Sequence, residues 1–207
     1  MNTQKPYLEQ HLTFKDKGDI YDEEGRAIMM EWETPLMEKY ANIICSKGGD
    51  ILNIGYGMGI IDNYIQSHNP KTHWIVEAHP QIQKQMCKKG WLKKSNVRCI
   101  FDTWQNVSQY LPKFNGIFID TFDAYEIPFY ENVHKMLKFN GIFSFFYTPS
   151  SFHTPLFQNA LKVLEKNFEI KYQEVSIPNI PSLNNQGNEP YFDNIQNYKI
   201  PYFYLKN

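Results

Sequence analysis

The stretch DILNIGYGMGIIDNYIQSH, residues 50–68, decides the fold. Residues 51–54 form an apolar run typical of a buried strand, and residues 60–68 have the pattern of a helix. Between them, glycines occupy every second position from Gly55 to Gly59. Glycine permits a tight turn, and it lets a ligand approach bare backbone at the start of the next helix. The stretch therefore predicts a strand, a ligand-binding turn and a helix.

The same alternation of strand and helix continues through the rest of the chain. It indicates βαβ units and a parallel sheet with helices on both faces. Pro201 lies in the last expected strand and places that strand at or near an edge of the sheet, because proline cannot donate to a ladder. The further strands are expected at residues 73–79, 97–102, 114–120, 142–148, 169–177 and 198–206, and the further helices at 34–47, 80–90, 105–111, 129–141 and 155–168.

Composition limits the class of protein. The 207 residues, 42% of them apolar, are enough for one globular domain, and no second domain or repeat is visible. A net charge of −1 gives no electrostatic footprint for nucleic acid or an anionic membrane, so we expect neither as a partner. The three cysteines are widely spaced and lack metal-ligand spacing, and the N-terminus lacks the apolar run of a signal peptide. We therefore expect no metal and a reducing, cytoplasmic location.

Glu77 ends the second expected strand, 20 residues beyond Gly57. An acid in this place accepts hydrogen bonds from the ribose hydroxyls of a nucleotide cofactor. Nicotinamide dinucleotides and S-adenosylmethionine (AdoMet) both bind to this arrangement. A helix ahead of the first strand, the single domain and the two strands that end the chain favour AdoMet. We therefore predict an α/β, Rossmann-like class I methyltransferase fold, with a seven-stranded, mostly parallel sheet whose last strand is reversed.

The segment FDTWQNV, residues 101–107, follows the third expected strand. Asp102 is placed to accept a hydrogen bond from the adenine amino group, and Gln105 is a second candidate. Trp104 offers a flat apolar wall for the adenine ring, with an ordinary place in the core as the alternative.

Two acids indicate the second substrate. In MMEWETPLM, residues 29–37, Thr34 and Pro35 predict a helix start with a capping hydroxyl, so Glu33 is expected just outside the helix. A simple interaction of Glu33 with the helix dipole is the alternative. Asp120 ends a central strand, where open α/β sheets bind their substrates. Two carboxylates match the planar donor fork of a guanidinium group, with Asp120 expected to accept the departing proton and Glu33 mainly to orient the substrate.

Several motifs together resemble a known family. They are MMEWETPLM, KGGDILNIGYGMGI, HWIVEAHP, WQNV, FNGIFIDTF and SFFYT. These motifs resemble the family of guanidinoacetate methyltransferase and the type IV protein arginine methyltransferases, which methylate the internal (δ) guanidino nitrogen of arginine. The resemblance runs from about Tyr21 to the C-terminus.

The resemblance implies roles for individual residues. Glu33 and Asp120 would be the catalytic residues that contact the guanidinium group. Residues 1–33 would form a lid segment on a methyltransferase domain that spans residues 34–207. The implied AdoMet contacts are Tyr21, Met30, Gly55, Gly57, Met58, Glu77, Ala78, Asp102, Thr103, Trp104, Gln105 and Asp120.

The resemblance also bears on the substrate. GRAIMMEWETPLM and EAHP match the arginine branch more closely, so arginine, free or within a polypeptide, is the favoured substrate. Guanidinoacetate, methylated to creatine, is the alternative. Tyr147 and Thr148 would border the substrate in either case. More distant alternatives are an NAD-dependent oxidoreductase and a catalytically inactive AdoMet-binding module.

Overall fold

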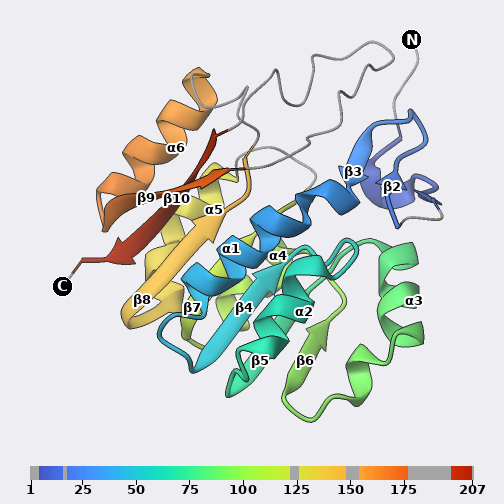
Figure 1. Ribbon diagram of the computed structural model, residues 1–207, viewed down its shortest axis with the longest axis horizontal. Helices are drawn as coiled ribbons and strands as arrows, with labels where there is room; N and C mark the ends of the chain where they lie inside the picture. The colour runs from blue at the N-terminus through green and yellow to red at the C-terminus, as the bar shows by residue number, and fades with distance from the viewer. Residues whose placement is uncertain (1–4, 16–17, 122–125, 148–153, 177–196, 207) are drawn as a thin grey trace.

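The computed structural model describes residues 5–15, 18–121, 126–147, 154–176 and 197–206. Its centre is a seven-stranded sheet in the order β6-β5-β4-β7-β8-β10-β9 (Figure 1). Neighbouring strands from β6 to β8 pair in parallel, and β10 runs antiparallel to both of its neighbours. The strands are β4 (Asp50–Ile54), β5 (Thr72–Val76), β6 (Val97–Ile100), β7 (Phe114–Ile119), β8 (Leu137–Phe145), β9 (Phe168–Ser176) and β10 (Asn197–Leu205). The predicted fold class, with its reversed last strand, is confirmed.

Helices cover both faces of this sheet, with α1 and α2 in front of the strands and α5 behind them in the view of Figure 1. The buried face of α1 carries Leu36, Met37 and Tyr40, each fully shielded from solvent, and packs on the apolar strands. The helices are α1 (Thr34–Ile44), α2 (Ile60–Ser67), α3 (Pro80–Lys88), α4 (Trp104–Val107), α5 (Ile127–Asn132) and α6 (Pro155–Glu165). None of the helices in the described ranges is long and apolar enough to cross a membrane.

The helix predicted at residues 129–141 is wrong in its second half. The α5 helix ends at Asn132, a 3-10 turn η5 (Val133–Met136) follows, and β8 begins at Leu137. The buried positions of Val133, Met136 and Leu137 fit a helical spacing, but here they serve a tighter turn and a strand start. Asn140 has a φ of 57°, which ends any helix at that point.

Pro201 lies one strand in from the edge, because β10 is between β8 and the edge strand β9. The pairing of β10 with β8 covers Tyr202 to Tyr204 and so begins directly after the proline. At Pro201 itself, the Ser144 hydroxyl donates to the backbone carbonyl (2.6 Å). Proline lacks a backbone N–H, and at position 201 none is needed for pairing with β8, because that pairing begins only at Tyr202.

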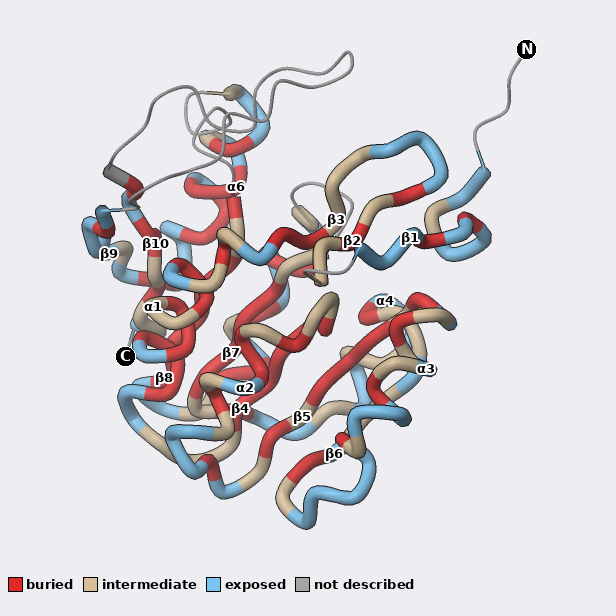
Figure 2. The backbone as a smooth tube through the Cα atoms, turned by 45° about the vertical axis from the view of Figure 1, so that its right-hand side comes forward, coloured by how far each residue is buried: buried red, intermediate tan, exposed pale blue. Residues whose placement is uncertain are grey.

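The N-terminal residues form a small antiparallel sheet that lies against the main domain (Figure 2). Its strands are β1 (Thr13–Phe14), β2 (Ile20–Tyr21) and β3 (Ala27–Met29), preceded by the 3-10 turn η1 (Tyr7–Glu9). Leu12 and Ile20 are each 1% exposed and belong to the main hydrophobic core. The segment is therefore packed on the domain through apolar contacts.

Candidate functional site

The glycine turn after β4 is shaped by what surrounds it. Gly55 has a φ of 92°, and a Cβ at this position would overlap the backbone carbonyl of Asp120. The N–H of Asp120 donates to the carbonyl of Ile54 (2.9 Å), so the ends of β4 and β7 are held together there. Gly57, with a φ of 53°, lies against the side chain of Met29. Only glycine at position 55 allows the turn and Asp120 to approach this closely.

Glu77 lies beneath the same turn and is only 5% exposed. Its Oε2 accepts a hydrogen bond from the backbone N–H of Tyr56 (2.8 Å), and its Oε1 accepts one from the N–H of His79 (2.6 Å). Burial raises the pKa of the Glu77 carboxyl, and the backbone N–H groups that face it oppose this shift. The acid expected on the ribose therefore also fixes the glycine turn.

A buried polar network, which no sequence motif indicated, supports the turn from below. The Asn53 side-chain amide donates to the Gly55 carbonyl (2.9 Å) and to both carboxylate oxygens of Asp62 (3.0 Å each). His73 Nε2 lies 3.1 Å from Asp62 Oδ1. Asn53, Asp62 and His73 are all fully shielded from solvent. The signal that was available is a polar Asn53 in the middle of an otherwise apolar strand.

The first predicted acid, Glu33, occupies a different local structure from the one expected. Residues Glu31–Glu33 form a 3-10 turn, η2, that continues into α1. Thr34 does not cap the helix, because its hydroxyl donates to the carbonyl of Glu31 (2.6 Å). Glu33 is 2% exposed, and its Oε1 accepts a hydrogen bond from the N–H of Met30 (3.0 Å). The carboxylate is thus buried and held by the turn that precedes the helix.

Asp120 lies close enough to Glu33 for its charge to act on the Glu33 carboxyl. Burial raises the pKa of Glu33 well above its ordinary value, and the charge of Asp120 raises it further. Burial alone raises the pKa of Asp120 to about 7. Two desolvated carboxyls side by side are unfavourable unless a proton or a cation compensates for their charge. The pair is therefore suited to a cationic group with two or more donors.

The residues expected around the adenine lie together at the start of α4. Trp104 is 9% exposed and packs edge-on against Phe129, with ring centroids 5.2 Å apart. Asp102 Oδ1 accepts hydrogen bonds from the N–H of Thr103 (2.7 Å) and from the Asn106 side chain (2.8 Å). Gln105 is exposed. Trp104 thus belongs to the core, while the polar residues of this segment border the surface.

The remaining predicted contacts divide between the N-terminal segment and the main domain. Met30 is 3% exposed, and Tyr21 is half-buried in the N-terminal sheet. Met58 lies against Gly18, and a Cβ at position 18 would overlap the methyl group of Met58. The Ala78 carbonyl accepts a hydrogen bond from the Gln83 side chain (3.0 Å).

Tyr147 is buried beyond the end of β8, where its ring stacks on that of Tyr198 at 4.8 Å. Its hydroxyl donates to the backbone carbonyl of Lys199, and the Tyr198 hydroxyl donates to the Tyr147 carbonyl (2.6 Å). Both tyrosines lie at the carboxyl ends of the parallel strands, where Asp120 also lies. Tyr147 follows the end of β8, and Tyr198 is near the start of β10, which runs antiparallel to β8. Thr148, the other predicted substrate contact, lies outside the described residues.

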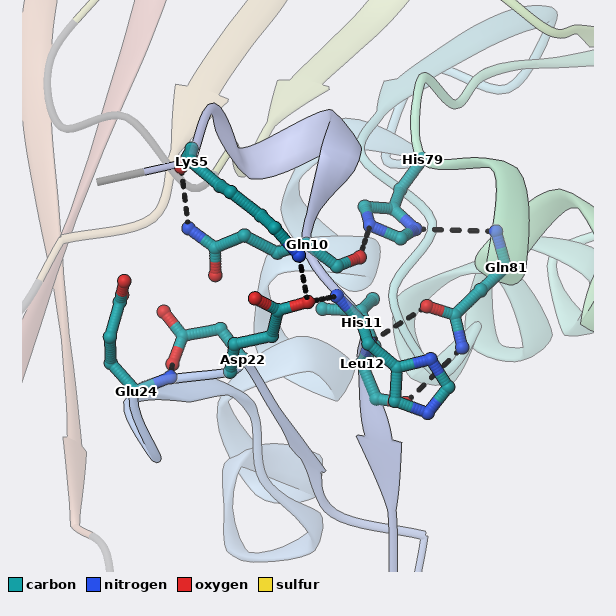
Figure 3. Close-up of polar contacts among 9 residues, drawn as sticks. Lys5, Gln10, His11, Leu12, Asp22, Glu24, His79 and Gln81 are labelled. Carbon is teal, nitrogen blue, oxygen red and sulfur yellow. Dashed lines mark hydrogen bonds and ion pairs between the residues drawn. The ribbon is translucent and has the colours of Figure 1, made fainter. Parts of the chain in front are cut away.

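Two residues at the start of α3 hold the N-terminal segment (Figure 3). Gln81 pairs with Leu12 like a strand residue: its Oε1 accepts from the Leu12 N–H (2.7 Å) and its Nε2 donates to the Leu12 carbonyl (3.2 Å). His79 Nδ1 accepts from the N–H of Gln81 (3.2 Å), which leaves Nε2 as the donor to the Gln10 carbonyl (3.2 Å). These contacts fasten the segment at positions two and four residues beyond Glu77.

The fold is that of the Rossmann-like methyltransferases, as the solved structures show. Spermidine synthase from Thermotoga maritima superimposes with a TM-score of 0.69 at 16% sequence identity, over 95% of this chain and 69% of that chain. Precorrin-6y C5,15-methyltransferase from Geobacter metallireducens gives a TM-score of 0.60 at 13% identity, over 94% of this chain and 95% of that chain.

The chain belongs to the guanidinoacetate N-methyltransferase family, whose family model matches residues 2–174. Among curated proteins, protein arginine N-methyltransferase 2 of Saccharomyces cerevisiae is 38% identical over an alignment of 156 residues that covers 69% of this chain and 38% of the relative. The protein of the same name from Aspergillus oryzae is 31% identical over a gapped alignment of 214 residues that covers 96% of this chain and 51% of the relative. The chain therefore spans between about a third and a half of the length of these relatives. The resemblance drawn from the motifs is confirmed.

Proposed function

We propose that this chain is an AdoMet-dependent N-methyltransferase that acts on a guanidino nitrogen of arginine, free or within a polypeptide. The observation that carries the proposal is the pair of desolvated carboxyls, Glu33 and Asp120, beside the glycine turn. Two desolvated carboxyls near each other are stabilised by a compensating cation, and guanidinium offers parallel N–H donors that match carboxylates. The relatives named as arginine methyltransferases support the same substrate class.

The residues present fit AdoMet as the cofactor, which when bound supplies an electrophilic methyl group on a sulfonium. Gly55, Gly57 and Met58 expose backbone at the start of α2, where the methionine end of the cofactor would bind. Glu77 and Ala78 would hold the ribose at the end of the neighbouring strand.

The adenine would lie along residues 102–105, with the Asp102, Thr103 and Gln105 side chains available at the surface beside Trp104. Tyr21 and Met30, in the segment before Thr34, would cover the cofactor from the other side. We therefore propose that residues 1–33 are a lid on a methyltransferase domain formed by residues 34–207, with the lid excluding water once the substrates are bound.

The proposed reaction requires the protein to activate a poor nucleophile. Guanidinium is protonated at neutral pH and its lone pairs are delocalised. Glu33 and Asp120 would bind it, draw its positive charge toward the nitrogens they contact and aim the remaining nitrogen at the methyl group. As that nitrogen forms its bond to carbon it loses a proton, which Asp120 would accept. A carboxyl with a pKa of about 7 is well suited to hold that proton at neutral pH.

Guanidinoacetate is the second candidate substrate, and the matching family model is the observation that favours it. A small guanidino acid needs a partner for its carboxylate, whereas arginine in a polypeptide does not. The loop that would supply this partner, residues 148–153, lies outside the described residues. The cytoplasmic location stays a prediction from the sequence.

A methyl-transfer assay with free arginine, an arginine-containing peptide and guanidinoacetate tests the proposal. We expect transfer to at least one arginine substrate and little to guanidinoacetate. Efficient transfer to guanidinoacetate alone would reverse the choice of substrate. Calorimetric titration with AdoMet and with NAD, in parallel, would contradict the methyltransferase assignment if only NAD bound.

A further inference from the structure

Asp19 lies at the junction of the glycine turn and the turn that carries Glu33. Its neighbour Gly18 packs on Met58 of the glycine turn so closely that a Cβ at position 18 would overlap the Met58 methyl group. The Asp19 carboxylate itself reaches the other way, where its Oδ1 accepts a hydrogen bond from the N–H of Glu31 (2.8 Å). The two residues thus connect the candidate cofactor turn with η2.

The contact to Glu31 has a clear structural purpose. The first N–H groups of a helical turn have no partner within the turn, and side-chain oxygens usually satisfy them. In η2 two carboxylates do so: Glu33 accepts from the N–H of Met30, and Asp19 accepts from the N–H of Glu31. The position of the Glu33 carboxyl therefore depends on a turn that Asp19 holds from outside.

Asp19 also acts on Glu33 through its charge. The charge of Asp19 contributes to the raised pKa of Glu33, after burial and the charge of Asp120. Asp120 approaches from β7, Asp19 from the segment before β2, and Glu33 from η2. No group of described residues has an arrangement suited to a metal ion. An organic cation such as a guanidinium group would compensate for these negative charges.

We propose that Asp19 is a positioning residue of the guanidinium site: it holds the η2 turn that carries Glu33 and adds a third negative charge beside the acid pair. This inference rests on the proposed function for its ligand, but its structural part does not. In the sequence Asp19 stands in a polar, glycine-containing stretch with no motif around it. Only the folded arrangement assigns it to the site.

The test compares two substitutions at this position with a control in the same turn. Asp19→Asn keeps an oxygen that can accept from the Glu31 N–H but removes the charge, and Asp19→Ala removes both. Glu31→Gln is the matched control, because it removes one negative charge from an exposed side chain in η2. The measurements are calorimetric titrations with arginine and with AdoMet, together with melting temperatures.

We expect Asp19→Asn to weaken arginine binding by about three- to tenfold with AdoMet affinity unchanged. Asp19→Ala is expected to weaken arginine binding further and to lower the melting temperature, while Glu31→Gln binds arginine like the wild type. Wild-type arginine affinity in both Asp19 variants would overturn the proposal, as would an equal loss in Glu31→Gln.

A second measurement separates this inference from the proposed function. Carbon-13 NMR of the Glu33 carboxyl, in protein without any substrate, reports its titration directly. We expect its midpoint to fall in Asp19→Asn and to stay unchanged in Glu31→Gln. If the wild type binds neither arginine nor guanidinoacetate, the proposed function fails, and the NMR result still decides whether Asp19 acts on Glu33. An unchanged midpoint in Asp19→Asn would refute that action.

Discussion

The backbone carbonyl of Asp120 lies against the Cα of Gly55, in the space that a Cβ would occupy in any other residue. The candidate catalytic acid and the candidate cofactor turn are therefore in direct backbone contact. Because Asn53 also donates to the Gly55 carbonyl, the turn is fixed both from the side and from below. This rigidity is what a reaction between two bound substrates requires of the groups that hold them.

Replacing Gly55 by alanine is expected to disrupt this contact. Besides the strain of a φ of 92°, the added Cβ would collide with backbone, which cannot move aside as a flexible side chain can. Gly90→Ala is the matched control, since Gly90 also has a positive φ (77°) but has open space around the Cβ position. We expect the control to lose about 1–2 kcal/mol of stability and to bind AdoMet normally. Gly55→Ala should lose more stability and most AdoMet affinity in urea titrations and calorimetry. Similar behaviour of both variants would contradict the role given to the contact.

Substitution of Glu77 by glutamine tests the ribose contact. The amide keeps an oxygen for one backbone N–H but loses the charge that strengthens the bonds to ribose hydroxyls. We expect AdoMet affinity to fall by about 1–3 kcal/mol, because the bonds to ribose lose their charge assistance while one acceptor oxygen remains. Gln83→Ala controls for simple loosening of the strand end, because Gln83 donates to the carbonyls of Glu77 and Ala78. Unchanged AdoMet affinity in Glu77→Gln would remove Glu77 from the cofactor site.

The raised pKa of Asp120 predicts a pH-dependent stability difference between wild type and Asp120→Asn. A carboxyl whose pKa is higher in the folded than in the unfolded state stabilises the fold when protonated. That contribution is complete below the unfolded-state pKa of 3.8 and is lost as the pH rises through about 7. The uncharged asparagine does not lose it. Relative to wild type, the variant should therefore be more stable at pH 8 than at pH 5, by roughly 2–3 kcal/mol in urea denaturation. A pH-independent difference would show that Asp120 is not desolvated.

The attachment of the N-terminal segment can be tested at Gln81. Gln81→Ala removes both hydrogen bonds to Leu12, whereas Lys84→Ala changes an exposed residue of the same helix. Hydrogen exchange should quicken at residues 10–14 in the first variant alone, with the strands of the large sheet still protected. AdoMet affinity should fall at the same time if the segment covers the cofactor. Unchanged exchange at these residues would mean that the apolar contacts of Leu12 and Ile20 suffice to hold the segment.

Most of the fold could be predicted because its signals are local. The apolar strand, the alternating glycines and the helix at residues 50–68 each have a period or a residue type that only one structure satisfies. The helix predicted at 129–141 is wrong in its second half because the apolar spacing there fits a helix as well as a turn followed by a strand. The pairing of Leu137 with Phe114 on β7 favours the strand. Thr34 likewise has the residue type of a cap, but the 3-10 turn η2 runs directly into α1, so that Glu33 and not Thr34 stands in the capping position.

The site was predictable only in part, for a related reason. Glu33, Asp120 and Glu77 stand at the ends of recognisable elements and inside recognisable motifs. Asp19 and the buried Asp62 gain their roles from partners distant in the chain or in another element, namely Glu31 and His73. No periodicity or spacing records such partners. The sequence therefore identifies the residues of the candidate site, whose roles stay a prediction, but not the polar residues that hold them in place.

Calorimetric titration of arginine shows whether Glu33 and Asp120 together bind a guanidinium group. The measurement is made on the wild type, Glu33→Gln, Asp120→Asn and the double variant, each also titrated with AdoMet. We predict that each single change weakens arginine binding by tenfold or more, because each leaves one donor pair of the guanidinium without a charged acceptor. The double variant should lose less than the sum of the two, since the acids act on one ligand. Arginine affinity that is unaffected by either single change, with AdoMet binding intact, would contradict the account.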